Sequence, residues 1–370
     1  MKILFLTPWY PDETSPNHGI FVRDQAVALQ QVHQVVVVSA KVDYTNFSLF
    51  SYTLKESDFR NVKEYRISIK RSLPFLNQLV FFYIATRQTV KISRRFSPDV
   101  IHGNIGYPGA FWAWLVSTVI RKPYVITEHT SRFAANFRSS IHKLLTLFSL
   151  KRAKAVISVS TSAAAEVSAF INKQPIVIPN IIDFEKFPVL TRNNDATWQI
   201  GFLGSLNGNT KGLDILLNTL VNVNTEFVLH IGGAGKLLEE YKVLAKRLKI
   251  EDKCIFYGFV SHVEVPNFMK RLHFFVSASR FESFGMVMVE AMACGLPVVA
   301  TASGGPSDFI NSANGILVDK ENIPALQHGI ESMMKNYQQY DPDQIRAFAV
   351  KNYSASKFVE ASNKVYASLT

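Results

Sequence analysis

The stretch SRFESFGMVMVEAMACGLPVVAT, residues 279–301, predicts a polar loop, a short helix, a glycine stop and a buried strand. The helix is expected to begin near Ser283 and to end at Gly295, with Pro297 just beyond it. Residues 298–301 are an apolar, mostly β-branched run that is typical of a buried parallel strand. This order of elements predicts one strand–helix–strand unit of an α/β domain.

Two carboxylates, Glu282 and Glu290, belong to this segment. Glu282 lies at or before the first turn of the predicted helix, and Glu290 lies about two turns further on. At roughly 1.5 Å per residue they would lie ~12 Å apart along the axis, too far to share a proton or a small metal ion. Between them the free amides of residues 283–286 form an end that binds phosphate. The pattern favours a nucleotide diphosphate sugar. The alternative is that Glu282 caps the helix and Glu290 is a solvated surface residue.

The motif ESFG at 282–285, the seven residues between the two glutamates, and EAMACGLP at 290–297 resemble the retaining glycosyltransferases of family 4. The resemblance covers nearly the whole chain. It implies the GT-B fold, an α/β architecture of two Rossmann-like doubly wound domains that face each other across a cleft. The resemblance also implies an enzyme of the kind found in bacterial surface polysaccharide biosynthesis.

The chain of 370 residues is long for one core, and its strands and helices alternate twice. We expect an N-terminal acceptor-side domain over 1–183, a charged linker over 184–197 and a donor domain over 198–350. Residues 351–370 are expected to form a C-terminal helix, which we consider as packing back toward the N-terminal domain. Within the first domain, residues 41–62 predict an irregular segment and residues 74–96 a helix.

A polar glycine loop, GSLNGNTKG at 204–212, lies between a predicted strand and a helix. Lys211 at the helix mouth would neutralise a departing diphosphate, although such a loop alone is more typical of a solvated turn. The resemblance implies an arginine and a lysine that both grip the diphosphate. Ser205 replaces that arginine, and Arg280 is considered as its substitute. A second glycine run, 232–236, predicts a tight turn.

Three residues of the N-terminal half are candidates for the same site. Gly19 joins a loop to a helix, which fits either a plain turn or the approach of backbone to the donor. His129 ends a predicted strand, and His102 is a weaker candidate of the same kind. A lone histidine at a strand end more often has no role. The resemblance favours a role for Gly19 and His129 beside the donor.

The resemblance implies a role for each matching position. Glu290 would hold the ribose, Glu282 the hydroxyls of the donor sugar, and the backbone amides of Phe284, Gly285 and Met286 the phosphates. The implied catalytic residues are Glu282, His129 and Lys211, and the implied donor-binding residues also include Gly19 and Ser205. Retention without an obvious nucleophile implies attack from the face that the phosphate leaves. No cofactor and no metal are expected.

The net charge of +11 is confined to one half of the chain. Residues 1–190 hold 23 Lys and Arg against 12 Asp and Glu, whereas residues 191–370 hold 17 of each. A basic half indicates an anionic partner. The segments 74–96 and 137–154 are basic and aromatic, which fits either an anionic membrane surface or ordinary solvated helices. No nucleic-acid motif is present, so the expected partners are a nucleotide-sugar donor and a glycan or lipid-linked acceptor.

The cysteine count and the hydropathy pattern bear on location. Two cysteines without metal-ligand spacing fit a reducing compartment, and no run of 18 or more apolar residues occurs. We expect a cytoplasmic protein that also lies on the inner face of the membrane. Two rival functions stay open at this point, a nucleotide-sugar epimerase of the same fold and a non-catalytic nucleotide-sugar-binding protein.

Overall fold

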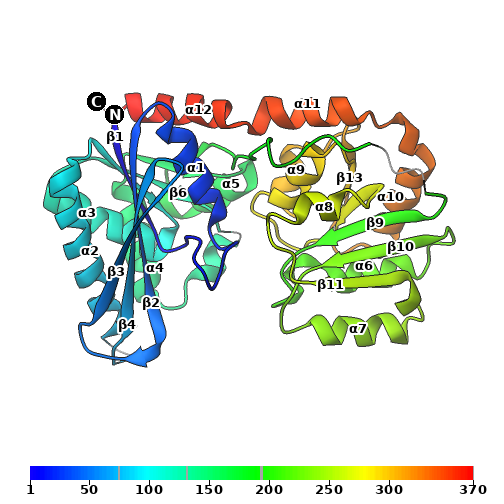
Figure 1. Cartoon of the computed structure of the whole chain (residues 1–370), viewed down its shortest axis with the longest axis horizontal. Coiled ribbons are helices and arrows are strands. Elements are labelled where there is room, and N and C mark those ends of the chain that lie inside the picture. The colour runs from blue at the N-terminus through cyan, green and yellow to red at the C-terminus, as the bar shows by residue number, and fades with distance from the viewer. Residues whose placement is uncertain (74–75, 131, 192–194, 370) are drawn as a thin grey trace. The chain divides into compact units, whose positions relative to one another are not determined.

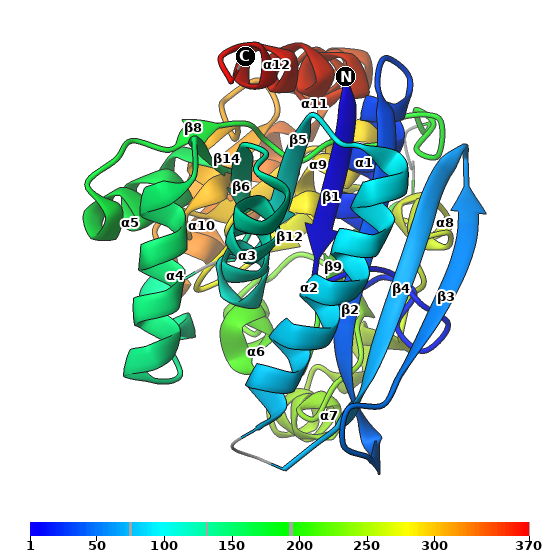
Figure 2. The same ribbon diagram turned by 90° about the vertical axis from the view of Figure 1, so that its left-hand side faces the viewer.

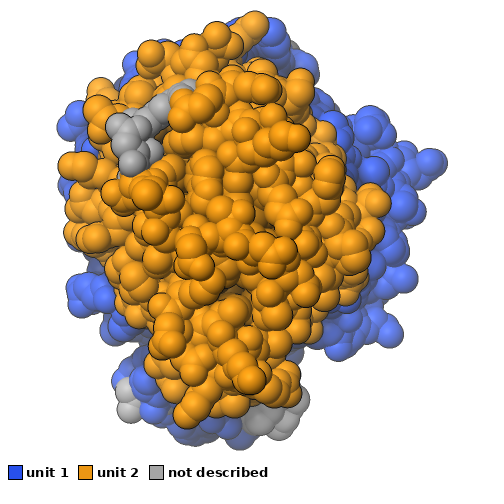
Figure 3. All heavy atoms as spheres, turned by 90° about the vertical axis from the view of Figure 1, so that its right-hand side faces the viewer, with its two compact units in different colours: residues 1–181, 355–370 blue, residues 182–354 orange. Residues whose placement is uncertain are grey.

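The computed structural model describes residues 1–73, 76–130, 132–191 and 195–369, and these form two compact units (Figures 1 and 3). Unit 1 comprises residues 1–181 and 355–370, and unit 2 comprises residues 182–354. The predicted helix start at 74 and the predicted linker residues 192–194 lie outside the described residues. The remainder of the predicted linker, from residue 184 onward, belongs to unit 2.

Unit 1 is built on an eight-stranded sheet with the order β3-β4-β2-β1-β5-β6-β7-β8. Its strands pair in parallel except for β3 and β4, which are antiparallel. The strands are β1 (Lys2–Thr7), β2 (Gln34–Phe47), β3 (Tyr52–Phe59), β4 (Val62–Arg71), β5 (Val100–Asn104), β6 (Tyr124–Glu128), β7 (Ala155–Ser158) and β8 (Ile176–Val177). The helices are α1 (Ile20–Gln30), α2 (Asn77–Phe96), α3 (Phe111–Ile120), α4 (Ser140–Arg152), α5 (Thr161–Ile171) and α12 (Ala355–Ala367).

Both faces of this sheet are covered, as the alternation of side chains along β1 shows. Leu4 and Leu6 pack into the core that includes residues of α2 and α3, whereas Ile3 and Phe5 pack into the core that includes residues of α1 and α12. Figure 2 shows α2, α3 and α4 on the near face of the sheet. A strand buried on both faces needs a continuous apolar run, and residues 3–6 of β1 provide one.

The prediction of an irregular segment over residues 41–62 is wrong. β2 continues to Phe47, and β3 pairs with β4 in antiparallel register from Tyr52 to Phe59. Most of β3 is exposed, with charged residues at 55, 56 and 58. An edge strand that faces water carries no apolar alternation, so hydropathy alone does not reveal it.

Unit 2 has a six-stranded parallel sheet with the order β11-β10-β9-β12-β13-β14. The strands are β9 (Trp198–Leu203), β10 (Phe227–Gly232), β11 (Cys254–Gly258), β12 (Phe274–Ser277), β13 (Val298–Thr301) and β14 (Gly315–Val318). The helices are α6 (Leu213–Leu220), α7 (Leu238–Arg247), α8 (Val265–Met269), α9 (Met286–Ala293), α10 (Ile323–Asn336) and α11 (Pro342–Tyr353).

The strand order of unit 2 reverses beside β9, which positions the candidate site. β10 lies on one side of β9 and β12 on the other, so the loops that leave β9 and β12 start side by side. In open α/β sheets, ligands bind at this switch point, beyond the carboxyl ends of the strands. The loop after β9 carries Lys211 and the loop after β12 carries Glu282, so the topology alone brings the two residues together.

Candidate active site

Lys211 and Glu282 form a direct ion pair at the switch point of unit 2. The Nζ of Lys211 donates to Oε2 of Glu282 at 2.5 Å, and both side chains are partly exposed. Gly204 makes room for the lysine, because a Cβ there would lie 3.0 Å from the Cγ of Lys211. The aliphatic part of the Lys211 side chain therefore packs against Gly204 at the start of the loop, and its ammonium reaches Glu282.

The glycines of this loop are needed for close approaches of the backbone. Gly212 has a φ of 69°, and a Cβ there would lie 1.9 Å from the carbonyl oxygen of Ala278, directly after β12. Gly235 belongs to the second glycine run, and a Cβ there would lie 2.2 Å from the carbonyl carbon of Leu206. As predicted, that run forms a tight turn. Its backbone packs against Leu206 in the loop that carries Lys211.

Arg280 links this loop to α6 and to Glu321. Its guanidinium donates to the carbonyl oxygen of Asn209 at 2.6 Å, to both carboxylate oxygens of Asp214 at 2.9 and 2.6 Å, and to Glu321 at 3.2 Å. Ser205 is exposed and carries no charge. These acceptors explain Arg280 as a structural residue, and its suggested substitution for the cation at 205 stays a prediction.

The backbone of Glu282 is fixed from both sides. Its amide donates to the carbonyl oxygen of Ser303 at 3.0 Å, and its own carbonyl accepts from the amide of Gly305 at 2.8 Å. Its carboxylate pairs with Lys211. Gly285 occupies the N-cap position of α9, and no side chain makes a capping hydrogen bond there. The capping alternative for Glu282 is therefore wrong.

Helix α9 begins at Met286, three residues later than the expected start at Ser283. Gly285 precedes it with a φ of 109°, and the side chain of Phe284 is buried, so these residues form the turn into the helix. The first amides of a helix have no partner within it, and here they include those of Met286 and Val287. Of the three residues whose amides were predicted to bind the phosphates, only Met286 lies within the helix, and the binding itself stays a prediction.

Glu290 lies inside unit 2 and not on a solvated surface. Its side chain is 4% exposed, and its Oε1 lies 3.2 Å from Nε2 of His262. The surface alternative for Glu290 is wrong. His262 was missed at the sequence level, although a polar residue just beyond the carboxyl end of β11 is a usable signal for a ligand site.

The histidines of unit 1 differ in what their rings contact. His129 is buried at the end of β6, with Nε2 3.0 Å from Oδ1 of Asn104. Burial, with a smaller effect of His102, lowers the pKa of His129 to about 3, so the ring is neutral at physiological pH. It can take part in hydrogen bonds but supplies no positive charge. The two ring nitrogens of His102 already contact Tyr366 and Thr127, which makes His102 a structural residue.

Gly19 is required by its own loop. It precedes α1 with a φ of 71°, and a Cβ there would lie 2.4 Å from the carbonyl oxygen of Trp9. Another residue at this position would have to move the loop after β1. The contact with Trp9 explains the glycine without a ligand, and a role for Gly19 or His129 beside the donor stays a prediction.

Two family models match the chain in succession. The model described as Glycosyltransferase Family 4 matches residues 18–186, and the model described as Glycosyl transferases group 1 matches residues 183–366. The second match contains Lys211, Glu282 and Glu290. The chain belongs to the family-4 glycosyltransferases. It is a glycosyltransferase with the GT-B fold, as the sequence predicted.

Several relatives and solved structures match this glycosyltransferase along most or all of its length. An uncharacterized glycosyltransferase of Methanocaldococcus jannaschii, MJ1178, is 27% identical over 88% of the chain and 90% of its own length. The putative teichuronic acid biosynthesis glycosyltransferase TuaC of Bacillus subtilis is 24% identical over 100% and 99%. The structure of Anabaena Alr3699/HepE in complex with UDP and glucose is similar with a TM-score of 0.77 at 20% identity, and covers 100% of both chains.

Over residues 1–73, 76–130, 132–191 and 195–369, no group of three or more His, Cys, Asp or Glu side chains is placed to hold a metal ion. In the same part of the chain, none of the helices combines the length and the apolar character that crossing a bilayer requires.

Proposed function

We propose that this glycosyltransferase moves a sugar from a nucleoside diphosphate sugar to an acceptor hydroxyl, with retention of the anomeric configuration and without a metal. The ion pair of Lys211 and Glu282 beside the N-terminus of α9 carries the proposal. A cation and helix amides suit a diphosphate, and a carboxylate suits the hydroxyl groups of a sugar, so this grouping supports a donor of this class. The UDP and glucose in the complex of Alr3699/HepE support a donor of this class.

In the proposed reaction, the bond between the anomeric carbon and the β-phosphate oxygen breaks, and its electrons go to that oxygen. The acceptor hydroxyl attacks the same face of the sugar, and its proton goes to the departing phosphate oxygen. Lys211 stabilises the charge that develops on the diphosphate, and the first amides of α9 share it. Glu282 binds sugar hydroxyls and keeps the ammonium of Lys211 in place before the donor arrives. The similarity to TuaC supports an acceptor in polysaccharide assembly.

Donor screening followed by product analysis tests this function. We expect one UDP- or GDP-sugar to raise the melting temperature, because a ligand that binds only the folded state stabilises it by RT ln(1 + [L]/Kd). With that donor and an acceptor, nucleotide release in the presence of EDTA and NMR of the product would show metal-independent retention. An inverted product, or a donor that is merely interconverted to another nucleotide sugar, would contradict the proposal.

We further propose that unit 1 binds an anionic membrane surface beside α2 and α4. Leu79 and Tyr83 of α2 and Leu144 of α4 are more than half exposed. The two helices are joined at this end by a hydrogen bond between Gln78 and His142. Exposed basic residues follow on the same helices: Arg87, Lys91 and Lys143. Apolar side chains next to cations suit the interface of an anionic bilayer.

Liposome flotation tests the membrane proposal. We expect the protein to float with vesicles of anionic phospholipid and not with purely zwitterionic ones, and L144E to weaken this by about tenfold, since it removes apolar contact and adds repulsion. The matched control is V243E, because Val243 is an apolar residue of unit 2 that is about as exposed as Leu144. Equal flotation of L144E and the wild type, or no flotation with either lipid, would reject the proposal.

A further inference from the structure

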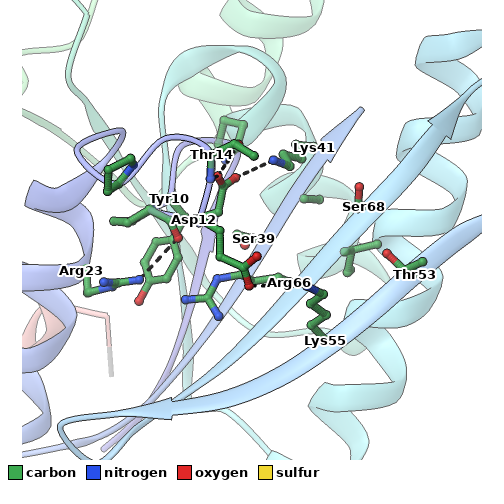
Figure 4. Close-up of a pocket in the computed structure, with 16 residues that line it drawn as sticks. Tyr10, Asp12, Thr14, Arg23, Ser39, Lys41, Thr53, Lys55, Arg66 and Ser68 are labelled. Carbon is green, nitrogen blue, oxygen red and sulfur yellow. Dashed lines mark hydrogen bonds and ion pairs between the residues drawn. The ribbon is translucent and has the colours of Figure 1, made fainter. Parts of the chain in front are cut away.

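A pocket lined by several charged and hydroxyl-bearing residues lies wholly within unit 1, and Lys211, Glu282 and Glu290 do not line it. It has a volume of about 470 Å³, which is within the range of small-molecule sites. Its walls come from the loop after β1 and from α1, β2, β3 and β4. Figure 4 shows four cationic side chains around it, together with residues that bear hydroxyl groups. The cationic residues are Arg23, Lys41, Lys55 and Arg66, and the hydroxyl residues include Thr14, Ser39, Thr53 and Ser68.

Two arginines of this pocket are held in place by one buried carboxylate. Glu64 is 1% exposed and forms ion pairs with Arg23 at 3.3 Å and with Arg66 at 2.5 Å. The hydroxyl of Tyr10 donates to the same carboxylate at 2.5 Å, and the guanidinium of Arg23 lies over the ring of Phe59 at 4.5 Å. These contacts restrict both guanidinium groups before a ligand binds. Planar donors held in this way suit the oxygens of a phosphate or a carboxylate.

Lys41 is able to exchange its present partner for a ligand. It pairs with Asp12 at 2.5 Å, and Asp12 also accepts from the amide and hydroxyl of Thr14 at 2.9 and 2.6 Å and from the amide of Ser15 at 3.0 Å. Burial raises the pKa of Asp12, but the hydrogen bonds from Lys41 and Thr14 lower it by more, so the carboxylate stays ionised. Asp12 would therefore keep several donors if the lysine turned to another anion.

Cations outnumber carboxylates in the lining. Four cationic residues face two acidic ones, Asp12 and Glu13, and the buried Glu64 offsets only one further charge. Glu13 lies 3.7 Å from Lys55 in a pair whose side chains are 91% and 72% exposed, which leaves Lys55 available to a ligand. The hydroxyl groups between the cations add partners for the hydroxyl groups of a sugar.

From these contacts we infer that the pocket binds a sugar that carries an anionic group, a phosphate or a carboxylate, and that this sugar is the acceptor of the transfer. The binding of the anion follows from the pocket itself. The assignment as acceptor rests on the proposed function: Lys211, Glu282 and Glu290 all belong to unit 2, so a separate ligand site in unit 1 is open to the other substrate. The reaction that precedes this one would then deliver a sugar phosphate or an acidic sugar.

Calorimetry on the whole chain tests the pocket, with saturating UDP present to occupy the donor site. The probes are glucose 6-phosphate, glucuronate and neutral glucose. We expect at least one anionic probe to bind about tenfold more tightly than glucose, and R66Q and K41Q each to weaken its binding by about fivefold or more, since each removes a charged hydrogen-bond donor. R94Q is the matched control, because Arg94 is exposed on α2 and does not line the pocket.

The two substitutions separate a folding defect from a loss of binding. R66Q removes one of the partners of the buried Glu64, so its melting temperature is measured first, whereas Lys41 is half exposed and K41Q leaves Asp12 with its other donors. A preference for phosphate or for carboxylate identifies the anion. Equal binding of glucose and both anions, binding of no probe, or unchanged affinity in K41Q would overturn the inference. UDP binding is measured separately, so a failure of the donor site would not be mistaken for a failure of this pocket.

Discussion

K211A is expected to lower kcat by about 100- to 1,000-fold and to change the Kd for UDP or GDP by no more than about threefold. The range is that found when one preorganised donor to a developing negative charge is removed. The lysine is expected to act mainly on the departing diphosphate, whose charge grows in the transition state, so its loss affects turnover more than ground-state binding. Single-turnover rates at saturating donor, together with calorimetry of the nucleotide, measure the two quantities.

Lys236 provides the matched control for this experiment. It is exposed on the neighbouring glycine turn, so K236A removes the same charge at a nearby place in the fold. We expect K236A to keep its rate, and K211R to recover part of the rate that K211A loses, because arginine restores the positive charge. A wild-type rate in K211A would mean that Lys211 does not neutralise the leaving group and that its pair with Glu282 is only structural.

E290A is expected to weaken the binding of UDP or GDP by about 10- to 100-fold. A buried carboxylate that accepts hydrogen bonds from a ribose makes charge-assisted contacts of about 1.5–3 kcal/mol each, and alanine cannot replace them. E290Q keeps one acceptor oxygen and should lose less. Titration calorimetry with the nucleotide alone measures the effect without an acceptor.

A stability measurement must accompany E290A, because the side chain lies within unit 2 and contacts His262. H262A tests that contact separately, since it removes the partner and leaves the carboxylate. The surface control is E239A, because Glu239 is an exposed glutamate of α7. If folded E290A bound UDP and GDP with unchanged affinity, the ribose role would be withdrawn, and the pair of Glu290 and His262 would be a structural contact.

The parts of the fold that the sequence predicted are those that a one-dimensional pattern encodes. The apolar run of β13 and the glycine and proline after α9 mark elements by burial or by backbone geometry, and both were predicted correctly. The antiparallel β3 was missed because its stability comes from pairing with β4, and exposed polar residues leave no hydropathy signal of that pairing. The start of α9 was placed too early because the buried Phe284 looks like a helical position.

For the site, residue types were predictable and partners were not. Lys211 and Glu282 are 71 positions apart, and only the neighbouring positions of β9 and β12 in the sheet explain their contact. Arg280 lies in the motif itself, but its acceptors, Asp214 and Glu321, are distant in sequence, so its structural role was not readable. The pocket around Arg66 has the same origin, since its lining residues come from five elements.

Unit 1 is formed by two separate segments of the chain, which has a consequence for its biosynthesis. Phe358, Val365 and Tyr366 of α12 complete an apolar core whose other members include residues of β1 and α1, and Tyr366 also contacts His102. A ribosome must therefore translate all of unit 2 before the last turns of that core exist. During this interval the nascent first unit exposes the apolar side chains that α12 later covers, and exposed apolar surface of this kind favours aggregation.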